Sequence, residues 1–368
     1  MSSDASHTTV PTVSIAGGRA RDSSVATPPV TGGVWHSAPV TPGPAAATDR
    51  YRGPVGTLVA PSPPSWDLLV TDWELDGLMI GVAAAGAAYE LGVRRLARRG
   101  RAWPRGRSIA FGLGLAAVAL ATQSGLAAYD DVLFSMHVVQ HLVLGMLAPL
   151  LLVSGAPVTL ALQASDRGAQ RRLLRVLHSR PVVLVTHPVT AWVLFGGTLV
   201  VLYFTGLYEL SLRNQWVHAA THAHFVAAGS LFMAHVVGVD PIPGALGYGP
   251  RLLYVLVALP FHAFLGVAIL SADRVLAAGW YGDVVRQWGA SPLADQRTGA
   301  GLLWVAGELF GLVAALIIVR RWMGQEERAA VRHDRRLQKS RVAAARDPSA
   351  TFAGPWRSGS ASSTPPRS

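Results

Sequence analysis

Seven stretches of about 20 residues, each almost entirely apolar, constrain the fold of this chain more than any other feature. An α-helix rises about 1.5 Å per residue, so each stretch is long enough to cross a hydrocarbon layer about 30 Å thick. The stretches lie near residues 75–93, 108–128, 134–154, 182–204, 216–238, 252–271 and 299–319. We therefore predict an all-α fold, a polytopic integral membrane bundle of about seven transmembrane helices.

Charged residues are scarce and segregated. They make up 14% of the 368 residues, against about a quarter in an ordinary soluble domain. The connections at 94–107 and 166–180 and the segment after the last stretch are rich in Arg, whereas 128–133 is acidic and 206–215 has a single Arg. Because cytoplasmic loops carry an excess of Lys and Arg, this alternation predicts an N-terminus outside and a C-terminus in the cytoplasm. The long connection 273–297 then falls outside, and we expect a structured loop there.

Composition divides the chain into three parts. Residues 1–65 are rich in Ser, Thr, Pro, Gly and Ala and lack hydrophobic periodicity, so we expect a disordered tail. Residues 66–322 should form the membrane domain, and residues 323–368 a basic, largely disordered cytoplasmic tail. Much of the net charge of +11 lies beside the apolar stretches, where it sets topology and attracts anionic lipid. We therefore expect the lipid bilayer, and not nucleic acid, as a partner.

The chain contains no cysteine. Disulfides, thiolate metal sites and iron–sulfur clusters are thereby excluded, and any metal must be bound by His, Met, carboxylate or backbone ligands. Neither an HExxH sequence nor a GxxxxGK[ST] sequence is present. A zinc protease of the HExxH type and a P-loop nucleotide hydrolase are therefore unsupported.

Two pairs of histidines lie within predicted spans. His137 and His141 occupy the start of the third span, and His218 and His222 the start of the fifth, and both spans begin on the predicted outer side. Residues four apart share one face of a helix. We therefore predict that these four imidazoles converge on one metal ion; imidazole suits copper, zinc, iron or nickel. Met136, beside the first pair, would favour Cu(I), although methionine is also ordinary apolar filler.

Several other polar residues are possible secondary ligands. They share a position within a predicted span, and they are His224, His235, His262 and Glu308. The alternative for each membrane histidine is a hydrogen bond between helices. A polar track through His235, His262 and Glu308 would instead indicate a transporter for copper or a small solute. A haem held between His141 and His222 is a further alternative, against which the crowding by neighbouring imidazoles argues.

Four sequence blocks, in order, resemble the CtaG family of seven-span assembly factors for caa3-type cytochrome c oxidase. The blocks are SMHVVQHLVLGMLAPLLLVSGAP, YFTGLYE, HAHFVAAGSLFMAHVVGVDPIP and LADQRTGAGLLWVAGE, within about residues 70–322. The residues that match the blocks are His137, His141, His222, Asp240, Pro241, Asp295 and Gln296. Through this resemblance, Asp240 and Asp295 become further possible secondary ligands. Some relatives carry a CopD-like copper-uptake domain, which we do not expect in this chain.

The resemblance implies a role in aerobic respiration in the bacterial plasma membrane. Its expected partners are subunits of cytochrome c oxidase. Combined with the histidine pairs, it leads to the hypothesis of a non-enzymatic assembly factor that binds Cu(I) at its outer face and delivers it to the oxidase. The transporter and the haem protein remain the alternatives.

Overall fold

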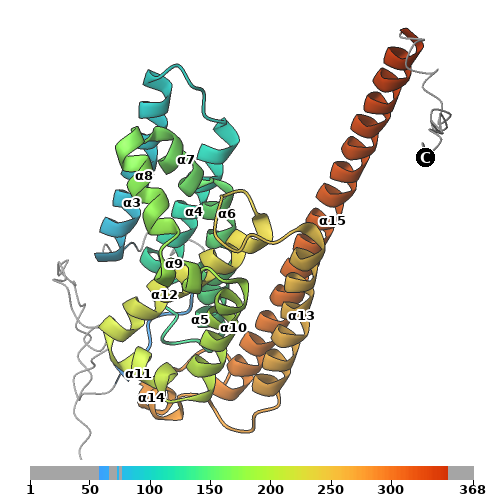
Figure 1. The fold of residues 1–368 in the computed structure, drawn as a ribbon. Helices are drawn as coiled ribbons and strands as arrows, with labels where there is room; N and C mark the ends of the chain where they lie inside the picture. The colour runs from blue at the N-terminus through green and yellow to red at the C-terminus, as the bar shows by residue number, and fades with distance from the viewer. Residues whose placement is uncertain (1–57, 66–72, 74–76, 347–368) are drawn as a thin grey trace, which may run out of the picture. The chain divides into compact units, whose positions relative to one another are not determined.

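The computed structural model describes residues 58–65, 73 and 77–346, and these are almost entirely helical (Figure 1). The helices are α3 (Gly77–Arg98), α4 (Arg105–Gln123), α5 (Phe134–Leu142), η1 (Val143–Leu147), α6 (Ala148–Ser154), α7 (Pro157–Ala164), α8 (Arg167–Leu177), α9 (Arg180–Val185), α10 (Pro188–Phe204), α11 (Leu207–Arg213), α12 (Gln215–Val237), α13 (Tyr248–Leu270), α14 (Ala278–Asp283) and α15 (Pro292–Arg346). The predicted all-α class is confirmed.

Helices cover all seven predicted stretches, but fewer meet the requirements for a membrane span. Within the described residues, three continuous helical segments are long and apolar enough to cross a membrane: Phe134–Ala164, Tyr248–Leu270 and Pro292–Val342. A fourth results if α10 and α11, which meet at a bend of 77°, form one span. Helix α12 has sufficient length, but four histidines lower its apolarity. The number of seven spans and the orientation therefore stay predictions.

The histidine-bearing helices α5 and α12 are held together by an unusually close approach. A Cβ atom on Gly229 of α12 would overlap the carbonyl oxygen of Gly145 and lie 2.8 Å from Cγ of Pro149. Gly145 lies within η1, a π-helical turn that follows α5 directly. Since Gly145 is four residues after His141 and Gly229 seven after His222, this contact fixes the spacing of the two helices one to two turns from the histidines.

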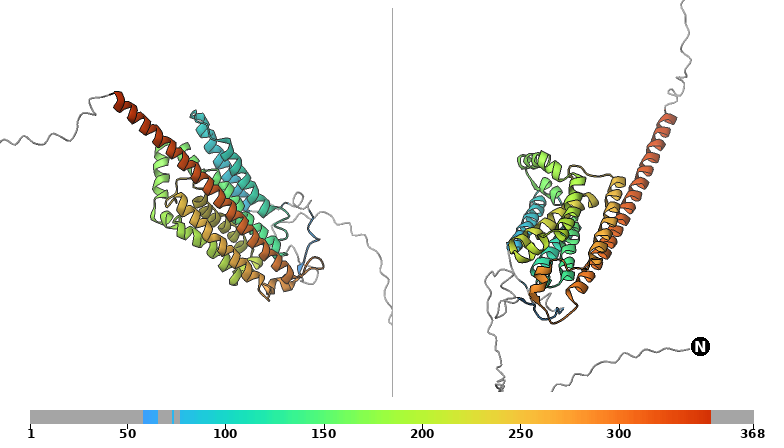
Figure 2. Two further views of the ribbon diagram at one scale, coloured as in Figure 1. Left: turned by 90° about the vertical axis from the view of Figure 1, so that its right-hand side faces the viewer. Right: turned by 90° about the horizontal axis from the view of Figure 1, so that it is seen from below.

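Helices α13 and α15 run side by side, as both views in Figure 2 show. Gly307 and Gly311 of α15 allow this contact, because a Cβ atom at Gly307 would lie 2.7 Å from Cβ of His262, and one at Gly311 would overlap Leu259. Small residues at such positions let helices pack closely within a membrane.

The boundaries of the expected tails differ from the structure at both ends. Helix α15 runs to Arg346, through residues expected to be largely disordered. The segment after Arg320 contains one Gly, no Pro and many good helix formers, so the helix continues from the apolar span. At the other end, β1 (Leu58–Val59) pairs in parallel with β2 (Val284–Val285). The predicted tail segments 1–57 and 347–368 lie outside the described residues.

Candidate metal centre

The two histidine pairs start at matched positions because both helices have well-defined N-termini. Asn214 caps α12, its Oδ1 accepting hydrogen bonds from the backbone N–H groups of Trp216 (2.9 Å) and Val217 (3.2 Å). Helix α5 is capped from α15: Asp295 accepts from the backbone N–H (3.2 Å) and the hydroxyl (2.5 Å) of Ser135. Both caps satisfy amide groups that a helix leaves unpaired.

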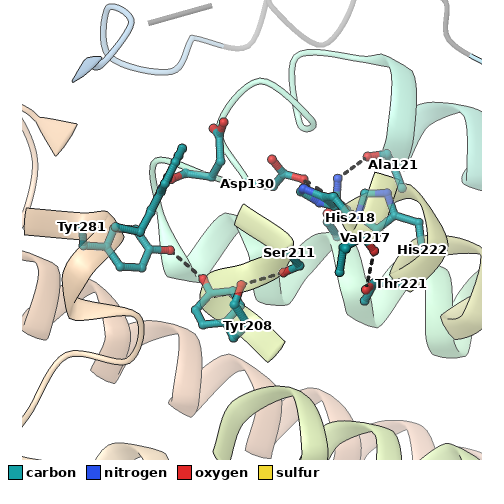
Figure 3. A network of polar contacts seen from close by, with 12 residues as sticks. Ala121, Asp130, Tyr208, Ser211, Val217, His218, Thr221, His222 and Tyr281 are labelled. Carbon is teal, nitrogen blue, oxygen red and sulfur yellow. Dashed lines mark hydrogen bonds and ion pairs between the residues drawn. The ribbon is translucent and has the colours of Figure 1, made fainter. Parts of the chain in front are cut away.

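Asp130, His218 and His222 converge on one point (Figure 3). Oδ2 of Asp130 lies 3.1 Å from Nε2 of His218 and 3.9 Å from Nε2 of His222, and the two Nε2 atoms lie 2.9 Å apart. Asp130 comes from the loop between α4 and α5, and both histidines come from α12. Among the described residues, no other set of three His, Asp or Glu side chains brings its ligand atoms within 4.8 Å of one another. We refer to these three residues as the carboxylate site.

Nε2 of His222 cannot donate hydrogen bonds to both of its neighbours at once. Nε2 of His222 is 2.9 Å from Oε1 of Gln140 and also 2.9 Å from Nε2 of His218. If Nε2 of His222 carries a hydrogen, it can donate to only one of these two atoms. If it carries none, it can donate to neither. A cation between Asp130 and the two imidazoles would instead be met by lone pairs from all three.

Asp130 carries its charge although it is buried. Burial acts to raise the pKa of Asp130, but the charge and hydrogen bond of His218, with a smaller contribution from His222, outweigh this effect and lower the pKa to about 2. The carboxyl group is therefore ionised at neutral pH and is available as an anionic ligand.

His137 and His141 lie next to the carboxylate site, without belonging to it. Their ring centroids are 3.9 Å apart, and His137 is 6.5 Å from His218 while His141 is 5.6 Å from His222. Only 1% of His137 and 4% of His141 is exposed. Among the residues that the structure describes, neither ring has a hydrogen-bond partner at Nδ1 or Nε2. We refer to these two residues as the imidazole pair.

Tyrosines close one side of the imidazole pair. The centroids of the Tyr208 and His137 rings are 4.6 Å apart, and the hydroxyl of Tyr208 is 2.7 Å from that of Tyr281. Figure 3 shows this contact between the two tyrosines. The Phe225 ring lies 4.1 Å from that of His141. The sequence analysis missed Asp130, Gln140 and Tyr208 as site residues. The sequence does hold a signal for two of them, because Asp130 lies within the acidic connection 128–133 before α5 and Tyr208 belongs to the YFTGLYE block.

Comparison with known proteins agrees with this architecture. Residues 87–325 match the family described as cytochrome c oxidase caa3 assembly factor, Caa3_CtaG. The chain belongs to this family. The sequence blocks quoted above therefore led to the correct family.

Mycobacterial relatives of this CtaG-family chain are longer proteins. The uncharacterized protein Mb0105 of Mycobacterium bovis is 38% identical over 284 residues, which are 75% of this chain and 43% of the relative. The uncharacterized protein ML1998 of Mycobacterium leprae is 35% identical over 283 residues, with the same shares. The chain thus spans less than half the length of these relatives. No solved structure matches it.

Three of the residues that match the family's blocks connect parts of the fold. Asp240 caps α7, accepting from the backbone N–H groups of Val158 (3.2 Å) and Thr159 (2.7 Å). Asp295 caps α5, as described above. Oε1 of Gln296 accepts from the backbone N–H of Leu276 at 2.6 Å and so anchors the loop after α13. In the structure, the predicted secondary ligands Asp240 and Asp295 thus serve as helix caps.

The remaining secondary candidates on α12 lie apart from the carboxylate site. His224 is exposed on another face of the helix and is 2.6 Å from the hydroxyl of Thr198. His235 lies near the far end of α12, with Nε2 at 2.9 Å from the carbonyl oxygen of Thr186. Met136 is half-buried and packs against apolar residues around Tyr129.

The polar track predicted through His235, His262 and Glu308 has mainly apolar surroundings at His262. Nδ1 of His262 donates to the carbonyl oxygen of Ala258, within its own helix, at 2.8 Å. The cavity beside His262 has a volume of about 10 Å³ and is otherwise lined by apolar residues and glycines. That is space for about one water molecule. Glu308 is half-buried on α15 and does not line this cavity.

Proposed function

We propose that this chain is a non-catalytic integral membrane assembly factor for a caa3-type cytochrome c oxidase, and that it binds copper as cargo at the carboxylate site. Membership of the family supports the assembly role. The copper role rests chiefly on one observation, the convergence of Asp130, His218 and His222 at the common end of α5 and α12. The oxidase subunits would be the recipients.

The spacing of the three ligand atoms suits a metal of the first transition row. Nitrogen ligands at about 2.0–2.1 Å in a tetrahedral arrangement lie about 3.3 Å from one another. The three separations of 2.9, 3.1 and 3.9 Å lie on both sides of that value. Binding would therefore require side-chain shifts of only a few tenths of an ångström to about half an ångström.

The two alternative functions receive less support. A transporter needs a polar route through the bundle, and the surroundings of His262 are apolar and tightly filled. A haem between His141 and His222 needs a slot for the macrocycle, yet the ring of Phe225 packs on His141 with centroids 4.1 Å apart.

Copper content of the purified full chain tests the proposal. The parent protein should bind Cu(I) under anaerobic conditions, and Asp130→Asn and His222→Ala should each weaken binding at least 10-fold. His224→Ala is the matched control, since it removes an imidazole from the same helix on another face. Cells that carry His222→Ala should accumulate oxidase with its haem and without its full copper. A parent protein that binds no copper would exclude the cargo role and leave a scaffold.

A further inference from the structure

We propose that His137 and His141 form a second metal site, which binds one Cu(I) ion in two-coordinate fashion beside the carboxylate site. This inference deepens the proposed function and rests on it. It replaces the sequence-based expectation that four imidazoles share one ion. The chain would accordingly hold two ions at once.

The imidazole pair differs from the other buried or half-buried histidines of the fold. His235 and His262 each have a ring nitrogen at hydrogen-bond distance from a backbone carbonyl oxygen. In the imidazole pair, all four ring nitrogens are buried, and none has a hydrogen-bond partner in the described part of the chain. A neutral imidazole has one donor and one acceptor nitrogen, so the pair buries two unmet donors and two unmet acceptors. Each unmet group costs about 1–3 kcal/mol, and a ligand that binds nitrogen lone pairs would offset part of this cost.

The imidazole pair and the carboxylate site are too far apart to share one ion as three ligands. Two nitrogens bound to the same ion, at about 2 Å each, lie at most about 4 Å apart. Among the described residues, only Asp130, His218 and His222 bring three ligand atoms within 4.8 Å of one another. No such set of three includes His137 or His141.

The surroundings of the imidazole pair favour a monovalent soft ion. Aromatic rings of Phe134, Tyr208 and Phe225 pack around the two histidines. The nearby carboxylate of Asp130 is already engaged by His218 at 3.1 Å. A divalent ion would bring two charges into this apolar pocket, and burial of an uncompensated charge is unfavourable. Cu(I) brings one charge, and imidazole is a suitable ligand for copper.

The two rings are in contact, and one ion can bind both only if they turn away from each other. Their centroids are 3.9 Å apart and their planes are tilted by 53°. Two nitrogens on opposite sides of one ion would be about 4 Å apart and their ring centroids about 6 Å apart, so binding requires the rings to separate by about 2 Å. Rotation of the rings about their side-chain bonds would bring one nitrogen of each ring to the ion.

The two sites are near enough for transfer of one ion between them. The ring centroids of His141 on α5 and His222 on α12 are 5.6 Å apart. In a transfer step, Cu(I) would form a bond to the His222 nitrogen and then lose its bond to His137. The ion stays Cu(I) and the imidazoles stay neutral, so the step requires no oxidant, reductant or proton.

The stoichiometry of Cu(I) binding to the full chain in nanodiscs tests this inference. Anaerobic titration against a chromophoric Cu(I) chelator should give two ions for the parent and one for the variant with both His137→Phe and His141→Leu. A variant with both Asp130→Asn and His218→Ala should also bind one ion. His224→Ala, the control, should bind two. X-ray absorption of the Asp130→Asn, His218→Ala variant should show copper with two nitrogen ligands.

A second measurement separates a ligand role from a structural role. Without metal, the His137→Phe, His141→Leu variant should melt at or above the temperature of the parent, because it removes unmet polar groups from an apolar pocket. A fall of several degrees would indicate hydrogen-bonding histidines and would overturn the inference. One ion in the parent would also overturn it, and would leave the proposed function intact if the Asp130→Asn, His218→Ala variant is the one that loses that ion. No ion in the parent would overturn the proposed function itself.

Discussion

The Nε2 atoms of His218 and His222 lie 2.9 Å apart and face the same carboxylate oxygen of Asp130, although the two rings stand on successive turns of α12. Spacing of four residues places both rings on one side of the helix, but it does not turn their nitrogens toward each other. The Asp130 loop supplies the common point toward which both rings turn. The carboxylate and the imidazoles therefore act as one unit, and their response to pH follows from that.

Metal binding at the carboxylate site should weaken below neutral pH because of the imidazoles and not because of Asp130. The pKa of Asp130 is lowered to about 2, since the effect of His218 exceeds that of burial, so this carboxylate stays ionised from neutral pH to well below pH 4. Imidazoles bind metal only when neutral, so protons compete with the metal for His218 and His222 as the pH falls. We expect the affinity for Zn²⁺, used as a redox-inert probe, to fall progressively as the pH is lowered from about 7 to about 4.

Titration calorimetry of the parent and of Asp130→Asn would check this prediction. The variant should bind more weakly at neutral pH, and the pH at which its binding is half lost should lie below that of the parent, because the neighbouring carboxylate no longer favours the protonated imidazoles. Parent binding that stays unchanged between about pH 7 and pH 4 would contradict proton competition at the imidazoles.

Substitution Gly229→Ala should disturb the approach of α12 to α5. The new methyl group would overlap the carbonyl oxygen of Gly145 and meet Pro149 at 2.8 Å, and these are rigid backbone and ring atoms. Overpacking of this kind destabilises by about 1–3 kcal/mol. We expect a lower melting temperature and weaker metal binding, because the His141–His222 separation depends on the same contact. Gly112→Ala on α4 is the control, since a Cβ atom there meets nothing within 4 Å. Equal effects of the two substitutions would contradict the close-approach argument.

The caps supplied by Asp295 and Asp240 should differ in their effect on the metal site. Asp295→Asn weakens the cap of α5, which carries His137 and His141, whereas Asp240→Asn weakens the cap of α7. Each change should destabilise the fold by about 1 kcal/mol, because both carboxylate oxygens accept hydrogen bonds and the amide keeps only one acceptor oxygen. Cu(I) affinity should fall for Asp295→Asn and stay near the parent value for Asp240→Asn. Thermal melts and Cu(I) titrations on the same samples distinguish the two effects, and a metal-ligand role for Asp240 would show as lost copper affinity in its variant.

The sequence alone predicted the helical class, the family and the adjacency of the two histidine pairs. Hydrophobic period and spacing are local properties, and they determine which residues share a helix face. Asp130 was missed because its position depends on how its loop folds back. That loop is held by contacts from distant segments, among them the hydrogen bond from Nε1 of Trp280 to the carbonyl oxygen of Asp131 at 2.7 Å.

The same limit applies to Asp240 and Asp295. An acidic residue beside a span can be a ligand or a cap, and the choice depends on which helix end lies opposite it in the folded chain. The sequence shows neither the partner helix nor the 77° bend between α10 and α11. It also does not distinguish four imidazoles around one ion from two adjacent sites, because that depends on the side-chain conformations.

The orientation of the chain in the membrane decides on which side the metal centre lies, and the absence of cysteine makes it directly measurable. Gln287 is exposed in the loop between β2 and α15, which the distribution of Arg assigns to the outside, and Gln170 is exposed on α8, which it assigns to the cytoplasm. Each can be changed to cysteine as the single thiol of the chain. In intact cells, a membrane-impermeant maleimide should label Gln287→Cys and leave Gln170→Cys unlabelled until the membrane is opened.

Helix α15 connects the Gln287 loop to α5 through Asp295 and Ser135, so this loop lies at the same end of the helices as the carboxylate site. Labelling in the opposite pattern would put the metal centre on the cytoplasmic side, and copper would then have to reach it from within the cell.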